Sequence, residues 1–407
     1  MFITDDIFEG QQLNHLQKVK NNLRPLFQRV NAIIKNESGK MLTIESIEIY
    51  KSPIRLKEPF KISLGILTHA ENVIVKINTN TGPTGYGECS PFLMINGESM
   101  DTCFIVGQYL ALVLKGKNPL DIDACTLAMD AVIYANNSIK SAFDIALYDI
   151  SAQEAGVPLY VFLGGSKTKE IITDYTVSMD DPQKMADDAV KIKANGFQVI
   201  KVKLGQPEKD VERIRMIRAA AGMEIPLRID ANQGWDVPAA ISILDELAPY
   251  NIQHCEEPIP RWNYMELANI RKQSPIKIMA DESCCDHHDA KRLIDLEACD
   301  YFNIKLGKSG GIFKALKIIQ LAGAGGIKIQ LGGFLESRLA FTAAAHLALA
   351  SDAIIYYDFD TPLMFVEDPV TEGITYDGRG VVTVPDTTGL GACIDEGYLK
   401  ELVKVIV

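Results

Sequence analysis

The sequence of 407 residues lacks several features that would place it in other classes of protein. It contains no run of about 18 uncharged apolar residues, so we expect no membrane-spanning helix. The first residues, MFITDDIFEG, are acidic where a signal peptide would be basic and apolar. An excess of positive charge is also missing, because the net charge is −12, and this argues against nucleic-acid or membrane partners. We therefore predict a cytoplasmic protein that acts on a small molecule.

The eight cysteines also lack the spacing of a metal site or of a disulfide framework. They are scattered, no CxxC occurs, and only Cys284 and Cys285 are adjacent. This pattern is typical of reduced thiols in a cytoplasmic protein and argues against a zinc site. The segment CCDHHD (284–289) has the composition of a metal site, but it follows a predicted strand where a loop turns into a helix. We interpret its histidines as loop or surface residues.

The pattern of apolar residues changes along the chain. Residues 11–36 place leucine and other apolar residues at helical spacing, which predicts an amphipathic helical extension over residues 1–41. Residues 42–80 are typical of strands and residues 98–155 of helices. Strands followed by helices favour an α+β domain, which we place at residues 42–165.

Eight β-rich segments recur from about residue 170, with helical stretches between them. Their spacing runs from about 24 to 28 residues, which is what one strand, one helix and two loops require. The spacing predicts a (β/α)₈-type barrel. The segments are TDYTVS (173–178), VIKVKL (199–204), LRIDAN (227–232), QHCEEP (253–258), KIMADE (277–282), FNIKLG (302–307), KIQLGG (328–333) and IIYYDFD (354–360).

Charged residues stand near the carboxyl ends of most of these segments, where the active site of such a barrel forms. A core does not tolerate so many charges without a function or a fully paired network. Asp230, Glu256 and Asp281 fall on three successive strands. They are hard oxygen donors without a neighbouring cysteine or histidine, and therefore suit Mg²⁺ or Mn²⁺ better than zinc.

Two lysines flank this predicted metal site, Lys203 on the second strand and Lys305 on the sixth, on opposite sides of the barrel mouth. Lys201 shares a side with Lys203, because residues i and i+2 of a strand point the same way. The ammonium of Lys201 and a divalent ion both disfavour protonation of Lys203, which favours a general base. Two bases across a metal imply a proton transfer from one face of a carbon to the other, through a metal-stabilised enediolate of a carboxylate.

These motifs together resemble the muconate-lactonizing subgroup of the enolase superfamily. They are KVK (201–203), DAN (230–232), EEP (256–258), ADES (280–283) and NIKLGKSGG (303–311), and the match spans about residues 42–395. The resemblance implies a modified (β/α)₇β barrel at residues 166–370, an α+β capping domain, and a final segment, 371–407, that returns to the cap. It implies that Lys203 and Lys305 are the acid/base pair and that Asp230, Glu256 and Asp281 bind Mg²⁺. Lys201 would contact the substrate carboxylate, and a homo-oligomer is expected. Glu257 departs from the subgroup, in which glutamine is common at this position.

The subgroup contains several reactions, and the segment YYDFDTP (356–362) separates them. Its Asp358 and Asp360 resemble the DxD segment that binds the α-ammonium group in dipeptide epimerases, and Thr176 falls in a segment that fits the same family. Two aspartates would repel the carboxylates that competing substrates bring to this end of the pocket. The sequence therefore predicts epimerisation at the carboxy-terminal residue of a dipeptide. N-acylamino-acid racemase, o-succinylbenzoate synthase and muconate-type cycloisomerase remain alternatives, whereas both lysines and all three ligand candidates argue against a silent barrel.

The side-chain specificity is predicted from the cap segment KISLGILTHAE (61–71), which we expect to be a mobile loop. Related L-Ala-D/L-Glu epimerases carry an arginine in this loop, and Gly65 aligns with it here. Phe334 would add an apolar wall. We therefore predict Ala-Ala or Ala-apolar dipeptides as substrates in preference to Ala-Glu.

Overall fold

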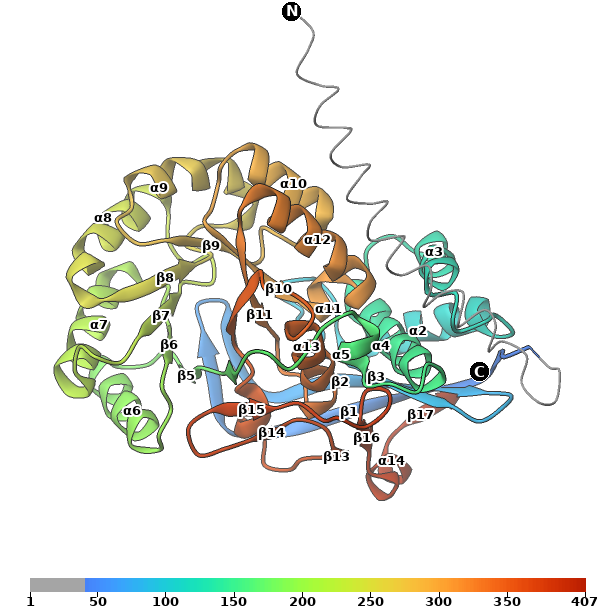
Figure 1. Ribbon diagram of the computed structural model, residues 1–407. Coiled ribbons are helices and arrows are strands. Elements are labelled where there is room, and N and C mark those ends of the chain that lie inside the picture. The colour runs from blue at the N-terminus through green and yellow to red at the C-terminus, as the bar shows by residue number, and fades with distance from the viewer. Residues whose placement is uncertain (1–40) are drawn as a thin grey trace, which may run out of the picture.

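The computed structural model describes residues 41–407, which form an antiparallel cap and a larger domain of alternating strands and helices (Figure 1). The predicted helical extension lies outside the described residues. We call residues 44–164 the cap and the alternating part that begins at β5 the β/α domain.

The cap is built on a four-stranded sheet in the order β17-β1-β2-β3. On one face of the sheet, alternate residues such as Ile47, Ile49 and Val75 are fully buried against the cap helices. On the other face, Tyr50 and Ile74 are buried in the main hydrophobic core. Helix α4 is buried along nearly its whole length, because it packs on the cap sheet and also on helices of the β/α domain. The cap elements are β1 (Ile44–Ile62), β2 (Gly65–Thr79), β3 (Thr84–Cys89), α2 (Met100–Leu114), α3 (Ile122–Val132), α4 (Asn137–Glu154) and α5 (Leu159–Phe162).

The β/α domain contains a curled parallel sheet in the order β5 to β12, with the helices arranged outside it (Figure 1). The backbone N–H of Asp174, next to β5, donates to the carbonyl of Tyr357 in β12 at 3.3 Å and so links the two edges. The predicted seven strand–helix units followed by a final strand are confirmed. The strands are β5 (Tyr175–Val177), β6 (Ile200–Lys203), β7 (Leu227–Asp230), β8 (Ile252–Glu256), β9 (Ile278–Ala280), β10 (Tyr301–Lys305), β11 (Lys328–Gly332) and β12 (Ile354–Tyr357). The helices are α6 (Pro182–Ala194), α7 (Pro207–Ala221), α8 (Val237–Leu247), α9 (Leu267–Gln273), α10 (His287–Asp295), α11 (Leu306–Ser309), α12 (Ile312–Gly325) and α13 (Arg338–Ala348).

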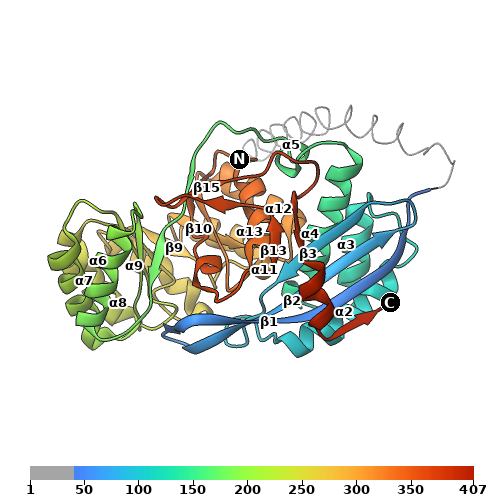
Figure 2. The ribbon, with the colours of Figure 1, turned by 90° about the horizontal axis from the view of Figure 1, so that it is seen from below.

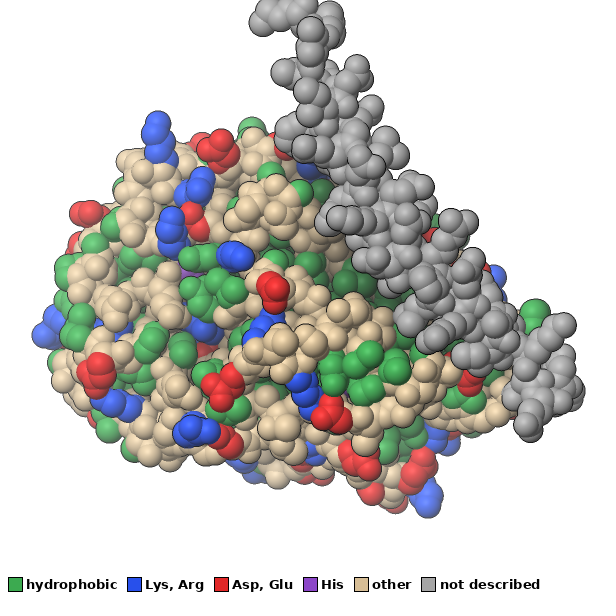
Figure 3. Space-filling model, in the orientation of Figure 1, with side chains coloured by type: hydrophobic (Ala, Val, Ile, Leu, Met, Phe, Trp, Pro, Cys, Tyr) green, Lys and Arg blue, Asp and Glu red, His purple; other side chains and the backbone are tan. Residues whose placement is uncertain are grey.

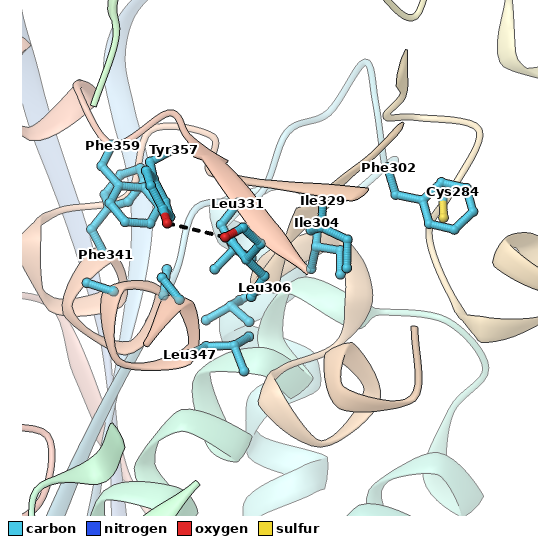
Figure 4. Packing of buried hydrophobic residues seen from close by; sticks show 14 of the residues in the cluster. Cys284, Phe302, Ile304, Leu306, Ile329, Leu331, Phe341, Leu347, Tyr357 and Phe359 are labelled. Atoms are coloured by element: carbon cyan, nitrogen blue, oxygen red, sulfur yellow. Dashed lines mark hydrogen bonds between the residues drawn. The ribbon is translucent and has the colours of Figure 1, made fainter. Parts of the chain in front are cut away.

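These strands are short and buried on both faces, and their two faces carry different residues. In β6, the apolar Ile200 and Val202 belong to the main hydrophobic core, whereas Lys201 and Lys203 make ion pairs within the curled sheet. The alternation follows from the twofold periodicity of a strand. Figure 4 shows the apolar layer around β10, β11 and β12, with Ile304, Ile329 and Leu331 in it. The alternation of side chains along each strand therefore places polar groups inside the curled sheet and apolar groups between the sheet and the helices.

The predicted mobile loop at residues 61–71 is instead part of a long β-hairpin. Ile62 pairs with Gly65, and beyond a bulge between Phe60 and Arg55 the ladder runs in register from Arg55 back to Ser46. The hairpin reaches from the cap to the β/α domain, as Figure 2 shows. Its tip is attached there, because Lys61 N–H donates to Ser178 Oγ at 2.6 Å and Lys61 O accepts from Met179 N–H at 2.9 Å. A regular ladder satisfies the backbone groups that a loop would leave to water.

The last part of the chain crosses back to the cap, where β17 (Lys404–Ile406) pairs antiparallel with β1. The elements before it are β4 (Ile171–Ile172), β13 (Val370–Glu372), β14 (Thr375–Tyr376), β15 (Val381–Thr383), β16 (Ala392–Ile394) and α14 (Glu396–Glu401). The boundaries of the domains that the sequence indicates, at residues 41, 165 and 370, remain predictions.

In the described residues, no helix is long and apolar enough to cross a membrane. Acidic and basic side chains are interspersed over the face shown in Figure 3.

Candidate active site

A small, partly open cavity lies between the hairpin tip of the cap and the carboxyl ends of the strands of the β/α domain. Thr176, Lys203, Lys305, Asp358 and Asp360 line its polar part. The apolar lining comes from both domains and consists of Phe60, Ile62, Phe92, Ile95, Phe334 and Leu335. The cavity therefore presents paired charges on one side and an apolar wall on the other.

The three predicted metal ligands lie next to one another beneath this cavity. Asp230 in β7 pairs in register with Glu256 in β8, and Asp281 follows the end of β9. All three are fully buried. Their strands are neighbours in the sheet, so the three side chains start from adjacent strand ends, although among the described residues their oxygens do not form a group within 4.8 Å of one another.

Three buried lysines surround these carboxylates. Lys201 Nζ contacts Glu256 at 2.9 Å and Asp358 at 2.8 Å. Lys203 Nζ is 2.6 Å from Asp230, and Lys305 Nζ is 2.6 Å from Asp281. Strands β6 and β10 are four positions apart in the eight-stranded sheet, so Lys203 and Lys305 face each other across its mouth.

The lysines decide the protonation of the carboxylates they contact. Burial alone would raise the pKa of Asp230, but the positive charges of Lys203 and Lys201 lower it overall. The pKa of Glu256 is lowered in the same way, against burial and the charge of Asp230. Burial would lower the pKa of Lys305, yet the carboxylate of Asp281 raises it. Asp230 and Glu256 are therefore ionised, which is the form that binds a metal.

The donor set fits a hard divalent cation. Asp230, Glu256 and Asp281 are buried carboxylates at the ends of neighbouring strands. Buried Asp281 Oδ2 accepts no hydrogen bond although it lies in ion-pair contact with Lys305. Carboxylate oxygens with a free acceptor position suit Mg²⁺.

Asp358 and Asp360 converge on one point, although β12 ends at Tyr357 and neither aspartate is in a strand. Phe359 between them points away into the core, where its ring centroid lies 5.3 Å from that of Phe341 and 6.0 Å from that of Tyr357 (Figure 4). This apolar anchor turns both neighbouring aspartates toward the cavity. The two aspartates therefore share a side although neither lies in a strand.

The two aspartates differ in their partners. Asp358 is bound by Lys201, and the lysine charges hold the pKa of Asp358 well below its usual range despite burial. Asp360 accepts the backbone N–H of Thr176 at 2.6 Å and has no lysine, so burial and the charge of Asp358 raise its pKa to about 7. One oxygen of Asp360 has no hydrogen-bond partner. Asp360 is therefore the carboxylate of the pair that awaits a cation.

Asp174 joins this pair, and oxygens of the three aspartates lie within 4.8 Å of one another. Such a group could hold a metal ion. However, Arg228 already contacts Asp174 at 2.8 Å and Lys201 contacts Asp358 at 2.8 Å. Two of the three carboxyl groups therefore already contact a cationic side chain, and Asp360 is the member of the group that does not.

Two predicted substrate-binding residues lie elsewhere than expected. Gly65 is not among the residues that line the cavity; a Cβ there would lie 3.0 Å from Met94 Cε. Its φ of 153° and this close approach explain why the hairpin turn carries glycine. Lys201 lies below the cavity, enclosed by carboxylates and only 1% exposed. The structure does bring Thr176 and Phe334 to the cavity.

The orientation of Glu257, which the sequence left open, is now defined. Its carboxylate accepts the backbone N–H groups of Asp281 at 2.7 Å and Ser283 at 3.2 Å, and also the hydroxyl of Ser283. Burial raises the pKa of Glu257 to about 7. Glu257 therefore braces the backbone that carries Asp281.

Sequence reasoning missed several residues at this site. Lys308 in α11 is fully buried and its Nζ lies 2.6 Å from Asp281 Oδ1 and 2.9 Å from the carbonyl of Asn303. The signal was present in NIKLGKSGG, where a second lysine follows Lys305 by three residues. Phe60 and Phe92 come from the cap, and no spacing in the sequence connects them with the strands. His287 and His288 begin α10 after the capping residue Asp286, as their position after a predicted strand indicated.

Comparison with known proteins places this geometry in a family. Residues 44–164 match the N-terminal domain of mandelate racemase / muconate lactonizing enzyme, and residues 184–398 match the enolase C-terminal domain-like family. A protein of Cytophaga hutchinsonii named D-Ala-D/L-Ala epimerase is 64% identical over 90% of this chain and 100% of its own length. The crystal structure of a dipeptide epimerase from that organism, complexed with Mg and D-Ala-L-Val, has a TM-score of 0.89 over the same shares of the two chains.

Two further relatives mark the range of activities. The dipeptide epimerase of Enterococcus faecalis V583, complexed with Mg and L-Leu-L-Tyr, is 37% identical with a TM-score of 0.84 over 86% of this chain and 99% of that one. The N-succinyl Arg/Lys racemase of Bacillus cereus is 33% identical with a TM-score of 0.87 over 90% and 100%. With both of its domains matched, this chain belongs to the mandelate racemase / muconate lactonizing enzyme family of the enolase superfamily.

Proposed function

We propose that the protein is a Mg²⁺-dependent isomerase that epimerises dipeptides at the α-carbon of the carboxy-terminal residue. The observation that carries this proposal is the position of Asp360, a buried carboxylate without a lysine, in a cavity that Lys203 and Lys305 enter from opposite sides. A free α-ammonium supplies the cation that Asp360 lacks. An N-acylated amino acid does not, and this favours a dipeptide over the substrates of related racemases and cycloisomerases.

The chemistry is a proton transfer between two faces of one carbon. One lysine, as the neutral amine, accepts the α-proton, and the electron pair of the C–H bond moves toward the carboxylate. The other lysine, as the ammonium, donates a proton to the opposite face and inverts the configuration. An ion held by Asp230, Glu256 and Asp281 would supply positive charge to the substrate carboxylate. Lys201 holds Glu256 and Asp358 in place, and so connects the carboxylate end of the site with the ammonium end.

The apolar wall supports small or apolar side chains at the carboxy-terminal position. Ile62, Phe92, Ile95 and Phe334 form one buried cluster beside the cavity. Its described lining includes no arginine, and its only cations are the two lysines of the acid/base pair. A glutamate side chain would therefore lose its hydration against apolar groups without gaining a partner. We propose Ala-Ala and Ala-apolar dipeptides as substrates in preference to Ala-Glu.

The test is incubation with Mg²⁺ and a dipeptide library in D₂O, with α-deuterium detected by mass spectrometry. The library should include dipeptides with either L-Ala or D-Ala at the amino terminus, because the relative from Cytophaga hutchinsonii bears the name D-Ala-D/L-Ala epimerase. N-acetylated versions of the same dipeptides are the matched control. We expect exchange only with a free amino group. The absence of exchange in every dipeptide would contradict the proposal, and Ala-Glu as the best substrate would contradict the specificity.

A further inference from the structure

The two lysines of the acid/base pair each lie against a phenylalanine ring. Lys203 Nζ is 5.8 Å from the ring centroid of Phe60, and Lys305 Nζ is 4.8 Å from that of Phe334. Both distances fall within the range of a cation–π contact, and both rings line the cavity. The pairs differ in origin, because Phe60 belongs to β1 of the cap and Phe334 to the segment after β11 of the β/α domain.

Lys203 has few other partners. Among the described residues, its Nζ forms an ion pair with Asp230 alone, whereas Lys201 in the same strand contacts three carboxylates. A lysine has four rotatable side-chain bonds, so one ion pair leaves its amino group several directions to point. The Phe60 ring occupies the space beside this group. The contact therefore fixes the direction in which Lys203 faces the cavity.

Phe60 reaches Lys203 only because the hairpin tip of the cap is docked. The residue after it, Lys61, bonds through its backbone to Ser178 and Met179, and Ser63 Oγ donates to the carbonyl of Asn232 at 2.7 Å. Phe334 belongs to the β/α domain, and its N–H donates to Glu336 Oε2 at 2.5 Å within its own segment. Its ring also packs on cap residues, with its centroid 5.6 Å from that of Phe92. The ring beside Lys203 is thus supplied by the cap, whereas the ring beside Lys305 is supplied by the β/α domain and packs against the cap.

We infer that Phe60 is a positioning residue for Lys203, so that a side chain of the cap hairpin controls proton transfer on the face of the substrate that Lys203 serves more strongly than on the other face. This inference rests on the proposed epimerase function and deepens it. It assigns the cap a role in the stereochemistry of the reaction, in addition to enclosing the substrate.

The rate of α-deuterium exchange, measured separately for the two epimers of the substrate, distinguishes proton transfer on the two faces of the α-carbon. In D₂O each neutral lysine carries two deuterons. After it takes the α-proton, the resulting ammonium holds one proton and two deuterons, and returns a deuteron to the same face in most events. Exchange without inversion therefore reports each lysine by itself. Epimerisation rates do not, because both directions of epimerisation require both lysines.

The experiment uses the full chain with Mg²⁺ and the best dipeptide found in wild-type protein. Lys203→Ala first identifies the epimer whose exchange depends on Lys203. Phe60→Leu, which removes the ring and keeps an apolar side chain, should slow exchange of that same epimer by about 10- to 100-fold. Exchange of the other epimer should change by less than about threefold, on the same reasoning that only positioning is lost. Phe60→Tyr should restore the rate, and Ser178→Ala, which loosens the hairpin, should slow the same epimer to a smaller extent.

Phe334→Leu is the mirror control and should slow the epimer that depends on Lys305. Equal slowing of both epimers by Phe60→Leu, or no slowing of either, would overturn the inference. Failure of the wild-type protein to exchange any dipeptide would instead reject the proposed function, so the two failures are distinguishable.

Discussion

Buried carboxylates occur in two regions of this molecule, and the two regions hold them in different ways. At the active site, Asp230, Glu256 and Asp358 are bound by lysine side chains. Where the cap packs on the β/α domain, Asp144 and Glu88 are bound mainly by backbone N–H groups. Asp144 of α4 accepts from Ile312 and Phe313 at the start of α12, and Glu88 of β3 accepts from Ser337 and Ala340 at the start of α13.

The pKa values follow this division. Lysine charges outweigh burial and lower the pKa of each of the three site carboxylates. At the interface burial prevails, raising the pKa of Asp144 to about 7 and that of Glu88 as well. A helix N-terminus supplies hydrogen bonds and a partial charge, which suffices for a fixed structural role. A side chain with a full positive charge is needed at the active site, where the carboxylate must stay ionised while its binding partner changes.

Removal of a site lysine should give the largest effect and show that this region serves catalysis more than stability. We expect Lys305→Ala to reduce epimerisation by about 10²- to 10⁴-fold, the range for loss of a general acid or base. Mass spectrometry of deuterium incorporation measures the rate, and urea unfolding monitors the fold. A variant that loses stability in proportion to activity would place Lys305 with the structural groups instead.

Asp360 lies at the active site, but it is the aspartate of the YYDFDTP segment that no lysine contacts. Its substitution therefore tests whether an active-site carboxylate without a lysine also serves function. We expect Asp360→Asn to lower kcat/KM for a free-amino dipeptide by about 100-fold, on the scale of losing a buried charged partner. The amide still accepts the N–H of Thr176, so folding should be preserved. Steady-state kinetics on the dipeptide provide the measurement. An unchanged kcat/KM for the free-amino dipeptide would show that Asp360 does not recognise the ammonium.

The sequence predicted these two regions unequally. The eight strands followed from their spacing, and the charged residues at the strand ends followed from the rule that parallel strands present their carboxyl ends together. Phe60 could not be placed, because its contact with Lys203 joins positions 60 and 203 across two domains. Asp144 reads as one polar residue of an amphipathic helix, and only packing shows that it caps α12. The hairpin at residues 61–71 was missed because its alternation is weak, with Ile66 exposed and Leu67 half-buried.

Substitution of a carboxylate at the interface between the cap and the β/α domain should lower the stability of the protein and leave its catalytic rate unchanged. Asp144→Ala removes the side-chain acceptor at the start of α12, and we expect it to cost about 2 kcal/mol of unfolding free energy. Asp144→Asn is the matched control and should cost a few tenths of a kcal/mol, because asparagine also caps helices well. Urea unfolding measures both variants. A fall in kcat of the folded Asp144→Ala protein would show that this interface is not separate from the site.

The smallest effect concerns a neutral group at the same interface, His346 of α13. Its Nδ1 accepts the N–H of Tyr160 at 3.0 Å and its Nε2 lies 2.9 Å from the carbonyl of Leu390, an arrangement that requires the neutral ring. Burial lowers the pKa of His346 to about 4, below its ordinary value of 6.5. The unfolded chain then binds more protons than the folded one between these values, so stability falls as the pH drops through this window. From pH 6.5 to 5.5 we expect His346 to account for a loss of about 1 kcal/mol, measured as the difference between wild-type protein and His346→Gln in urea unfolding. Glutamine does not titrate, and equal pH dependence of the two proteins would show that the ring is not held neutral by its burial.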